Sequence, residues 1–166
     1  MDIKTQENPQ FKQGYLYAVR LLTASKKSTK ELSKRLKDKG YNPAIAEDIL
    51  ECLRSQGILD DRKMVDETIH WAKQAKQYGK KRISFELKKK GIAQNVIEEA
   101  LENYSKDEER ETAYQLAEIR WNKVKHLEPP KRKKKLFDFL VSRGFDFELA
   151  REIMNRLDSK KDNDDF

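Results

Sequence analysis

Lysine and arginine gather in three dense blocks, and these cations are the residues best suited to binding chemistry. We single out as candidate contact residues Lys34, Arg35, Lys80, Lys81, Arg82, Lys88, Lys89, Lys131, Arg132, Lys133, Lys134 and Arg143. Ammonium and guanidinium groups bind phosphates and carboxylates by charge and by hydrogen bonds. A helix that reads bases uses Arg, Asn or Gln, whereas these blocks are mostly lysine with few aromatic residues among them. The pattern therefore favours contact with phosphates or carboxylates without discrimination between bases.

The net charge alternates in sign along the chain. Residues 20–40 carry +6, residues 73–91 carry +7 and residues 120–143 carry +7, while the segments after each block are acidic, so that the total is +7. If the blocks lie at equivalent places in similar modules, they can follow a polyanion or an acidic groove on a protein. The alternative is that each block is only the solvated face of a short helix.

Other chemistries lack the residues they need. His70 and His126 are far apart in the sequence, with only Cys52 as a further soft ligand, which is no metal-ligand spacing. The six glycines form no GxGxxG, GxxxxGK[ST] or GxSxG motif. We therefore predict a protein that is not an enzyme and has no cofactor or metal.

The composition indicates a cytoplasmic chain of small modules. No apolar run is long enough to cross a bilayer, and the N-terminal MDIKTQENPQ does not look like a secretory signal. A single cysteine suits a reducing compartment. With 37% hydrophobic and 39% charged residues, several thin cores are favoured over one large core.

The sequence repeats itself about every 50 residues. The segments RLKDKGYNPAIAEDILECL, ELKKKGIAQNVIEEALENY and FLVSRGFDFELAREIMNRL align on Gly40, Gly91 and Gly144. A leucine stands four residues before each glycine, and apolar residues stand one, five, ten and thirteen residues after it. A basic residue immediately precedes every glycine. These columns predict three tandem copies of one structural module.

Each copy is predicted to contain three helices and no strand. The apolar columns after each glycine form the buried stripe of one helix, and the glycine ends a shorter helix before it. Ser28 opens the short helix of the first copy with a capping box, and Asn42 caps the next one. Longer leading helices are expected at about 15–24, 61–78 and 108–127.

We therefore predict an all-α protein whose three tandem three-helix repeats form an elongated, curved array. The expected organisation is an N-terminal extension (1–14), repeats at 15–60, 61–107 and 108–157, and an acidic disordered tail (158–166).

Four further side chains are expected to pack inside the modules. They are Trp71, Trp121, Cys52 and Phe147.

The order and spacing of several short motifs resemble the RecX family of recombination regulators. The first repeat resembles the family in ELSKRLKDKGY (31–41) followed by GILDD (57–61). The second resembles it in YGKKRISFELKKKGI (78–92) and the third in KLFDFLVSRGF (135–145). The resemblance spans residues 15–157.

The resemblance implies a monomeric, non-enzymatic regulator whose partner is RecA. Proteins of this kind bind in the groove of the RecA filament on DNA and reduce its ATPase, strand-exchange and coprotease activities. This places them in DNA repair, homologous recombination and the SOS response, without a membrane. Some also bind single- or double-stranded DNA. The alternative function is a general DNA-binding architectural protein that contacts phosphates through its repeated lysine-rich helices.

Overall fold

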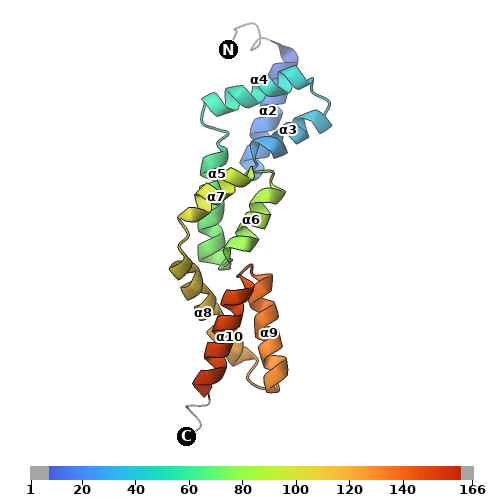
Figure 1. The fold of residues 1–166 in the computed structure, drawn as a ribbon. Coiled ribbons are helices and arrows are strands. Elements are labelled where there is room, and N and C mark those ends of the chain that lie inside the picture. Colours follow the sequence, from blue (N-terminus) through green and yellow to red (C-terminus); the bar gives the residue numbers. More distant parts are fainter. Residues whose placement is uncertain (1–7, 162–166) are drawn as a thin grey trace. The chain divides into compact units, whose positions relative to one another are not determined.

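The computed structural model describes residues 8–161 of the 166 (Figure 1). Over these residues the chain forms nine α-helices and one π-helical turn, with no strand, so the prediction of an all-α fold is confirmed. In chain order they are α2 (Pro9–Ala24), α3 (Thr29–Asp38), α4 (Pro43–Ser55), α5 (Asp61–Trp71), the π turn (Ala72–Lys76), α6 (Lys80–Lys89), α7 (Gln94–Glu102), α8 (Lys106–Lys123), α9 (Pro129–Ser142) and α10 (Phe147–Lys161).

The described chain divides into two compact units. Unit 1 contains residues 8–67 and 87–97, and unit 2 contains residues 68–86 and 98–161. Helices α2, α3 and α4 belong wholly to unit 1, and α8, α9 and α10 wholly to unit 2. The division falls within α5, α6 and α7, so the middle repeat contributes residues to both units.

The three aligned glycines end three short helices in the same way. Gly40, Gly91 and Gly144 have φ angles of 92°, 81° and 88°, which glycine adopts without a steric penalty. The residue after each glycine donates its N–H to the carbonyl of the leucine four residues before the glycine, as in a Schellman cap. These bonds are Tyr41 N to Leu36 O, Ile92 N to Leu87 O, and Phe145 N to Leu140 O. All three leucines are fully buried.

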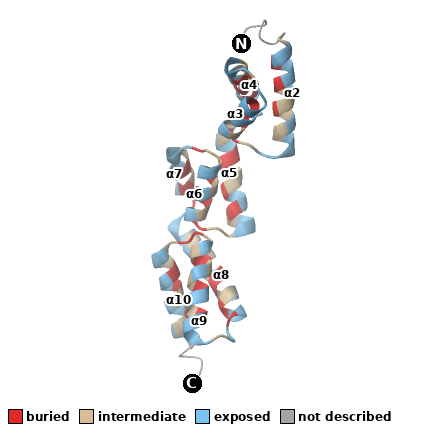
Figure 2. Ribbon diagram, turned by 90° about the vertical axis from the view of Figure 1, so that its right-hand side faces the viewer, coloured by how far each residue is buried: buried red, intermediate tan, exposed pale blue. Residues whose placement is uncertain are grey.

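Unit 1 has a core between α2, α3 and α4, and the buried residues line the facing sides of these helices (Figure 2). Ser28 opens α3 with a capping box, because its hydroxyl accepts the Glu31 N–H while the Glu31 carboxylate accepts the Ser28 N–H. Asn42 caps α4 in the predicted way, by accepting the Ala44 N–H.

The leading helix of unit 1 begins earlier than predicted. Helix α2 starts at Pro9 with Asn8 as its cap, six residues before the expected start at about residue 15. Phe11 and Gly14 are buried, and this burial holds the first two turns in place. A Cβ on Gly14 would lie only 2.5 Å from Ile49 Cδ1, which explains a glycine inside a helix.

Unit 2 has a core between α8, α9 and α10, and Trp121 is buried in it as predicted. Its helix bounds differ from the prediction at two ends. Helix α8 stops at Lys123, since Val124 leaves the helical conformation and its N–H donates to the Arg120 and Trp121 carbonyls. Helix α10 continues to Lys161, where we expected a disordered tail from residue 158; Asp158 pairs with Lys133 at 2.5 Å. Residues 162–166 of that tail lie outside the described residues.

Two of the aromatic residues expected inside are exposed. Trp71 is 53% exposed at the end of α5, where the helix passes into the π turn and the Lys76 ammonium lies 5.0 Å from the indole ring. Phe147 is 54% exposed, because it is the first residue of α10 and the fully buried positions of that helix begin at Ala150. Cys52 is buried as predicted.

Candidate partner-binding surfaces

Helix α3 has one apolar and one charged face. Leu32 and Leu36 are fully buried, while Lys34 and Arg35 are exposed. Glu31 and Asp38 share the face of Lys34 and Arg35 through their three- and four-residue spacing. The period of the helix therefore turns the first basic block towards solvent.

The charged face of α3 forms one wall of a hollow of about 540 Å³, which we call the basic hollow. Its lining residues come from the α2–α3 connection, α3 and the end of α6: Ser25, Lys26, Lys27, Glu31, Lys34, Arg35, Asp38, Lys89 and Lys90. Six of these are cations and two are carboxylates. All belong to unit 1, so this unit joins cations of the first block to the end of the second.

A buried hydroxyl fixes the two walls of the basic hollow together. Ser28 is 1% exposed, and its Oγ donates to the Lys90 carbonyl at 2.5 Å. The Lys90 ammonium also lies 3.6 Å from the Glu31 carboxylate. Since Glu31 completes the capping box of α3, the start of α3 and the Gly91 turn are held as one structure.

The cations of the basic hollow fall into two groups. Lys26 pairs with Glu67 and keeps the pKa of that carboxyl below its usual range, and Lys27 donates to the Leu21 carbonyl at 3.1 Å. The first group also includes Lys90, which pairs with Glu31. The side chains of the other group, Lys34, Arg35 and Lys89, make no hydrogen bond or ion pair to the described residues. These three cations are available to an anionic partner. Lys88, a fourth candidate, is exposed and lies outside the hollow.

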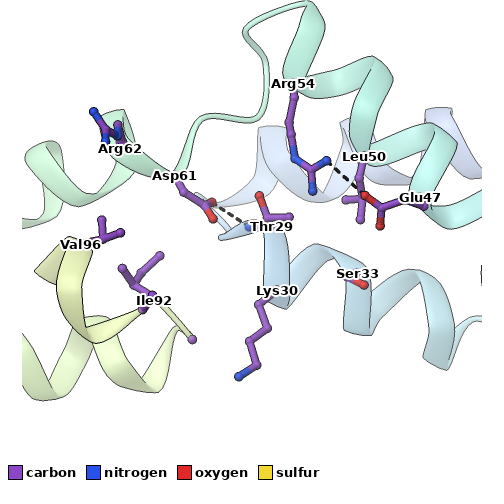
Figure 3. Close-up of a pocket in the computed structure, with 12 residues that line it drawn as sticks. Thr29, Lys30, Ser33, Glu47, Leu50, Arg54, Asp61, Arg62, Ile92 and Val96 are labelled. Atoms are coloured by element: carbon purple, nitrogen blue, oxygen red, sulfur yellow. Dashed lines mark hydrogen bonds and ion pairs between the residues drawn. The ribbon is translucent and has the colours of Figure 1, made fainter. Parts of the chain in front are cut away.

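A second cavity of about 440 Å³ lies on the other side of α3, and we call it the apolar-floored pocket (Figure 3). It is lined by Thr29, Lys30, Ser33, Glu47, Leu50, Arg54, Asp61, Arg62, Gly91, Ile92, Ala93 and Val96. Leu50 and Ile92 are buried at its floor. Charged groups stand around it, with Arg54 reaching towards Glu47 and Asp61 towards Thr29.

Sequence reasoning did not identify this pocket. The repeat pattern places Ile92 and Val96 among its apolar columns and so predicts both in the core. The half-buried state of Val96 leaves it on the pocket wall. Asp61 is the first residue of α5, and its carboxylate accepts the Thr29 N–H at 2.8 Å and so links α5 to α3.

One predicted contact residue of unit 2 is instead buried in the fold. Arg132 is 7% exposed, and its guanidinium donates to the Lys125 and Leu127 carbonyls at 2.6 and 3.1 Å. It also lies 5.0 Å from the centre of the Trp121 ring. Arg132 therefore fixes the α8–α9 connection, and its burial argues against a role as a contact residue. The spacing of basic residues in the block does not show that this one turns inwards.

The basic start of α6 is attached to the Gly144 turn within unit 2. The Gly79 and Lys81 N–H groups donate to the Arg143 and Gly144 carbonyls at 3.0 and 3.1 Å. The Arg143 guanidinium donates to the Lys76 carbonyl at 2.8 Å. Backbone hydrogen bonds and the Arg143 side chain therefore hold the start of α6 against the Gly144 turn, and we call this contact the Gly144 joint.

Most cations at this joint have partners in the fold. Lys81 pairs with Asp146 at 2.6 Å, and Arg82 pairs with Glu86 at 2.8 Å. Lys80 is half-buried beside Tyr104, with its ammonium 5.8 Å from the ring centre. The guanidinium groups of Arg82 and Arg143 also stand against one tyrosine ring, that of Tyr78, at 5.6 and 5.7 Å.

Two carboxylates of this joint have shifted pKa values. The Lys81 ammonium, together with the Glu148 N–H, holds the pKa of Asp146 below its usual range. Burial raises the pKa of Glu109, although its carboxylate accepts the Lys80 N–H at 2.7 Å. The joint is therefore sensitive to the protonation of side chains from α8 and from the α9–α10 turn.

Helix α9 carries four lysines, of which Lys133 is half-buried and the other three are exposed. Lys133 pairs with Asp158, and Lys134 pairs with Asp138 at 3.2 Å. Lys131 and Lys135 are exposed and make no ion pair within the described chain. Unit 2 therefore offers unpaired lysines on α9, whereas unit 1 places three unpaired cations around one hollow.

Residues 8–161 offer neither a metal site nor a membrane span. These residues contain no group of three or more His, Cys, Asp or Glu side chains placed to hold a metal. None of their helices is both long and apolar enough to cross a bilayer.

The fold and these surfaces define a class of all-helical proteins built from three tandem three-helix domains. Family models described as the first, second and third three-helix domains of RecX match residues 15–53, 60–101 and 107–154. The "Regulatory protein RecX" of Chlorobium limicola is 31% identical over 141 residues, which cover 85% of this chain and 87% of that protein. The chain belongs to the RecX family of regulatory proteins.

Two further comparisons agree with this assignment. The "Regulatory protein RecX" of Clostridium perfringens is 30% identical over 84% of this chain, and the chain spans 66% of that relative's length. The crystal structure of RecX from Lactobacillus salivarius superposes with a TM-score of 0.79 at 24% identity, over 90% of this chain and 97% of that one. The likeness to this crystal structure concerns the fold alone.

Proposed function

We propose that this chain binds the RecA filament on DNA and lowers its ATPase, strand-exchange and coprotease activities. The observation that carries the proposal is the basic hollow, where three cations without internal partners surround a cavity of about 540 Å³. Carboxylates of a filament groove, or DNA phosphates within it, are the groups that such a cavity would take. Membership of the RecX family supports RecA as the partner.

The mechanism follows from avidity. One exposed ion pair contributes only about 0.2–1 kcal/mol, so three cations in one cavity give a modest affinity. Further lysines on the same chain, such as Lys131 and Lys135 of α9, add contacts at a high effective concentration once the first contact forms. A chain held across neighbouring protomers would hinder the rearrangements that ATP turnover requires.

The test is RecA ATPase on single-stranded DNA against added protein. The triple variant Lys34→Glu, Arg35→Glu, Lys89→Glu reverses the free cations of the basic hollow, and we expect it to require about 10-fold more protein for the same inhibition. The matched control, Lys12→Glu, Arg20→Glu, Lys63→Glu, reverses three exposed cations of unit 1 outside the hollow. ATPase that does not respond to the wild-type protein would contradict the function, and equal potency of both variants would exclude the hollow.

The second candidate function is binding of DNA phosphates without RecA. The exposed lysines of α9 favour it, because they carry charge without a hollow or a stacking ring. Affinity for bare DNA would then fall steeply with salt, with a slope of about −0.7 to −0.9 for each phosphate contacted. Equal affinity for bare and RecA-coated DNA would favour this candidate over the first.

A further inference from the structure

Helix α3 separates two cavities of different chemistry within unit 1. Its residues Lys34 and Arg35 line the basic hollow, and Lys30 and Ser33 line the apolar-floored pocket. The Gly91 turn also separates them, because Lys90 lines the first cavity and Gly91 the second. A helix with its side chains is only about 10–12 Å across, a distance that three or four extended residues can span, so one short peptide can reach both cavities across this ridge.

The floor of the second cavity suits an aliphatic side chain. Leu50 is 1% and Ile92 is 8% exposed, and Val96 is half-buried beside them. Thr29, Ser33 and Ala93 at the wall are small. Figure 3 shows the Leu50, Ile92 and Val96 side chains around the cavity, with the charged ends of Arg54 and Glu47 directed to each other. Because Leu50 and Ile92 are already almost fully buried, the gain comes from the aliphatic group of the ligand, which leaves water when it enters the pocket.

We propose that unit 1 docks a protein segment that carries a bulky aliphatic residue next to carboxylates. The aliphatic side chain enters the apolar-floored pocket, and the carboxylates meet Lys34, Arg35 and Lys89 in the basic hollow. Charge complementarity favours carboxylates beside the aliphatic residue of the segment, since the hollow has six cations and two carboxylates. The proposal deepens the proposed function, on which it rests for the identity of the partner, by stating the chemistry of the segment that is recognised.

A protein segment fits these cavities better than nucleic acid does. Nucleic acid supplies phosphates for the basic hollow, but its bases stack on aromatic rings, and neither cavity is lined by one. An apolar cavity beside a charged one resembles a protein interface, which has an apolar core and a polar rim. Nucleic acid is therefore an outcome of the test rather than the expected ligand.

The experiment is a titration of the isotopically labelled full chain with a synthetic peptide, followed by its amide NMR signals. The peptide consists of glycine and serine with one leucine between two Asp-Glu pairs. Its two controls replace the leucine by serine or the acids by their amides. We expect the signals of Ser33, Ala93 and Val96 to shift, and the complete peptide to bind about 10-fold more tightly than either control.

A pair of variants tests the pocket directly. Ala93→Trp fills the apolar-floored pocket from an exposed wall position, whereas Ala44→Trp places the same ring at an exposed alanine outside both cavities. Ala93→Trp should weaken the complete peptide about 10-fold and leave the serine peptide unchanged, while Ala44→Trp should change neither. Equal affinity for the leucine and serine peptides would overturn the proposal, as would a single-stranded oligonucleotide that shifts the Ala93 and Val96 signals.

The two proposals can fail separately. Leucine-dependent peptide binding without any effect of the protein on RecA ATPase would contradict the proposed function and leave the docking site intact. Inhibition of RecA that is the same for wild type and Ala93→Trp, together with leucine-independent peptide binding, would contradict the docking site alone.

Discussion

Two glycine turns of this chain dock on the starts of two short helices, and they do so with different chemistry. In unit 1 the Gly91 turn meets the start of α3 through side chains, the Ser28 hydroxyl and the Lys30 stem. In unit 2 the Gly144 turn meets the start of α6 through backbone hydrogen bonds. Beside the first joint Lys34, Arg35 and Lys89 have no partner among the described residues, although Lys90 pairs with Glu31. At the second joint Lys81 and Arg82 are held in ion pairs and Arg82 and Arg143 in ring contacts. The same motif can therefore build a binding surface in one place and a structural joint in another.

The largest effect should come from a methyl group at the backbone joint. In Gly144→Ala the new Cβ would collide with the backbone and Cβ of Arg82 at a positive φ, so we expect a loss of about 3 kcal/mol in the free energy of unfolding. Gly91→Ala meets only the flexible Lys30 side chain, and Gly40→Ala meets nothing within 4 Å. Each of these should lose about 1 kcal/mol from the left-handed conformation.

Urea denaturation of the three variants measures this series. Equal losses would show that the Gly144 joint is no tighter than the Gly91 joint. The comparison between backbone and side-chain docking would then be wrong.

Removing the Ser28 hydroxyl should have the next largest effect. Ser28→Ala removes the cap of α3 and leaves the Lys90 carbonyl without its donor, for a combined loss of about 2 kcal/mol. The matched control is Ser105→Ala, because Ser105 caps α8 by accepting the Glu108 N–H from an exposed position. Its loss should be about 1 kcal/mol by urea denaturation. Equal losses in the two variants would show that the bond to Lys90 contributes nothing.

A smaller effect is expected from the ion pair of the unit 2 joint. Asp146→Asn keeps a cap for the Glu148 N–H but removes the charge opposite Lys81, which should cost less than about 1 kcal/mol at pH 7. Because the pKa of Asp146 is lowered in the fold, its carboxylate stabilises the protein above its unfolded pKa. This contribution disappears as the pH falls through the folded pKa. A stability difference between wild type and variant that persists at pH 2 would contradict the assignment.

The smallest effect concerns Glu109, and it has the opposite pH dependence. Burial raises the pKa of Glu109, so the folded state binds this proton more tightly than the unfolded chain does. Its contribution favours folding below the unfolded pKa and is lost as the pH rises through the raised folded pKa. Glu109→Gln should therefore flatten the decline in stability across this range in urea titrations at several pH values. An unchanged decline in the variant would show that groups other than Glu109 cause the loss of stability with rising pH.

The repeat could be predicted from sequence because its determinants are local. Gly40, Gly91 and Gly144, with the leucines four residues before them, set the helix ends through bonds within six residues. The capping box at Ser28 is equally local. These features follow from helix periodicity and capping, which a sequence displays directly.

The free or engaged state of each cation could not be predicted in the same way. Arg143 donates to a carbonyl 67 residues away, and Ser28 donates to one 62 residues away. Such partners depend on packing between helices, which the spacing of lysines does not encode. Arg132 shows the same limit, since its neighbour Lys131 is exposed while Arg132 itself is buried against Trp121.

Binding to RecA-coated single-stranded DNA is the measurement that tests the central claim most directly. The wild-type chain, the Lys34/Arg35/Lys89 charge-reversal variant and the Lys12/Arg20/Lys63 control should be compared on coated and bare DNA at one salt concentration. We predict that the hollow variant loses about 10-fold in affinity for coated DNA, while the control retains wild-type affinity. Equal losses in both variants, or no preference of the wild-type protein for coated over bare DNA, would contradict a basic hollow built for the filament.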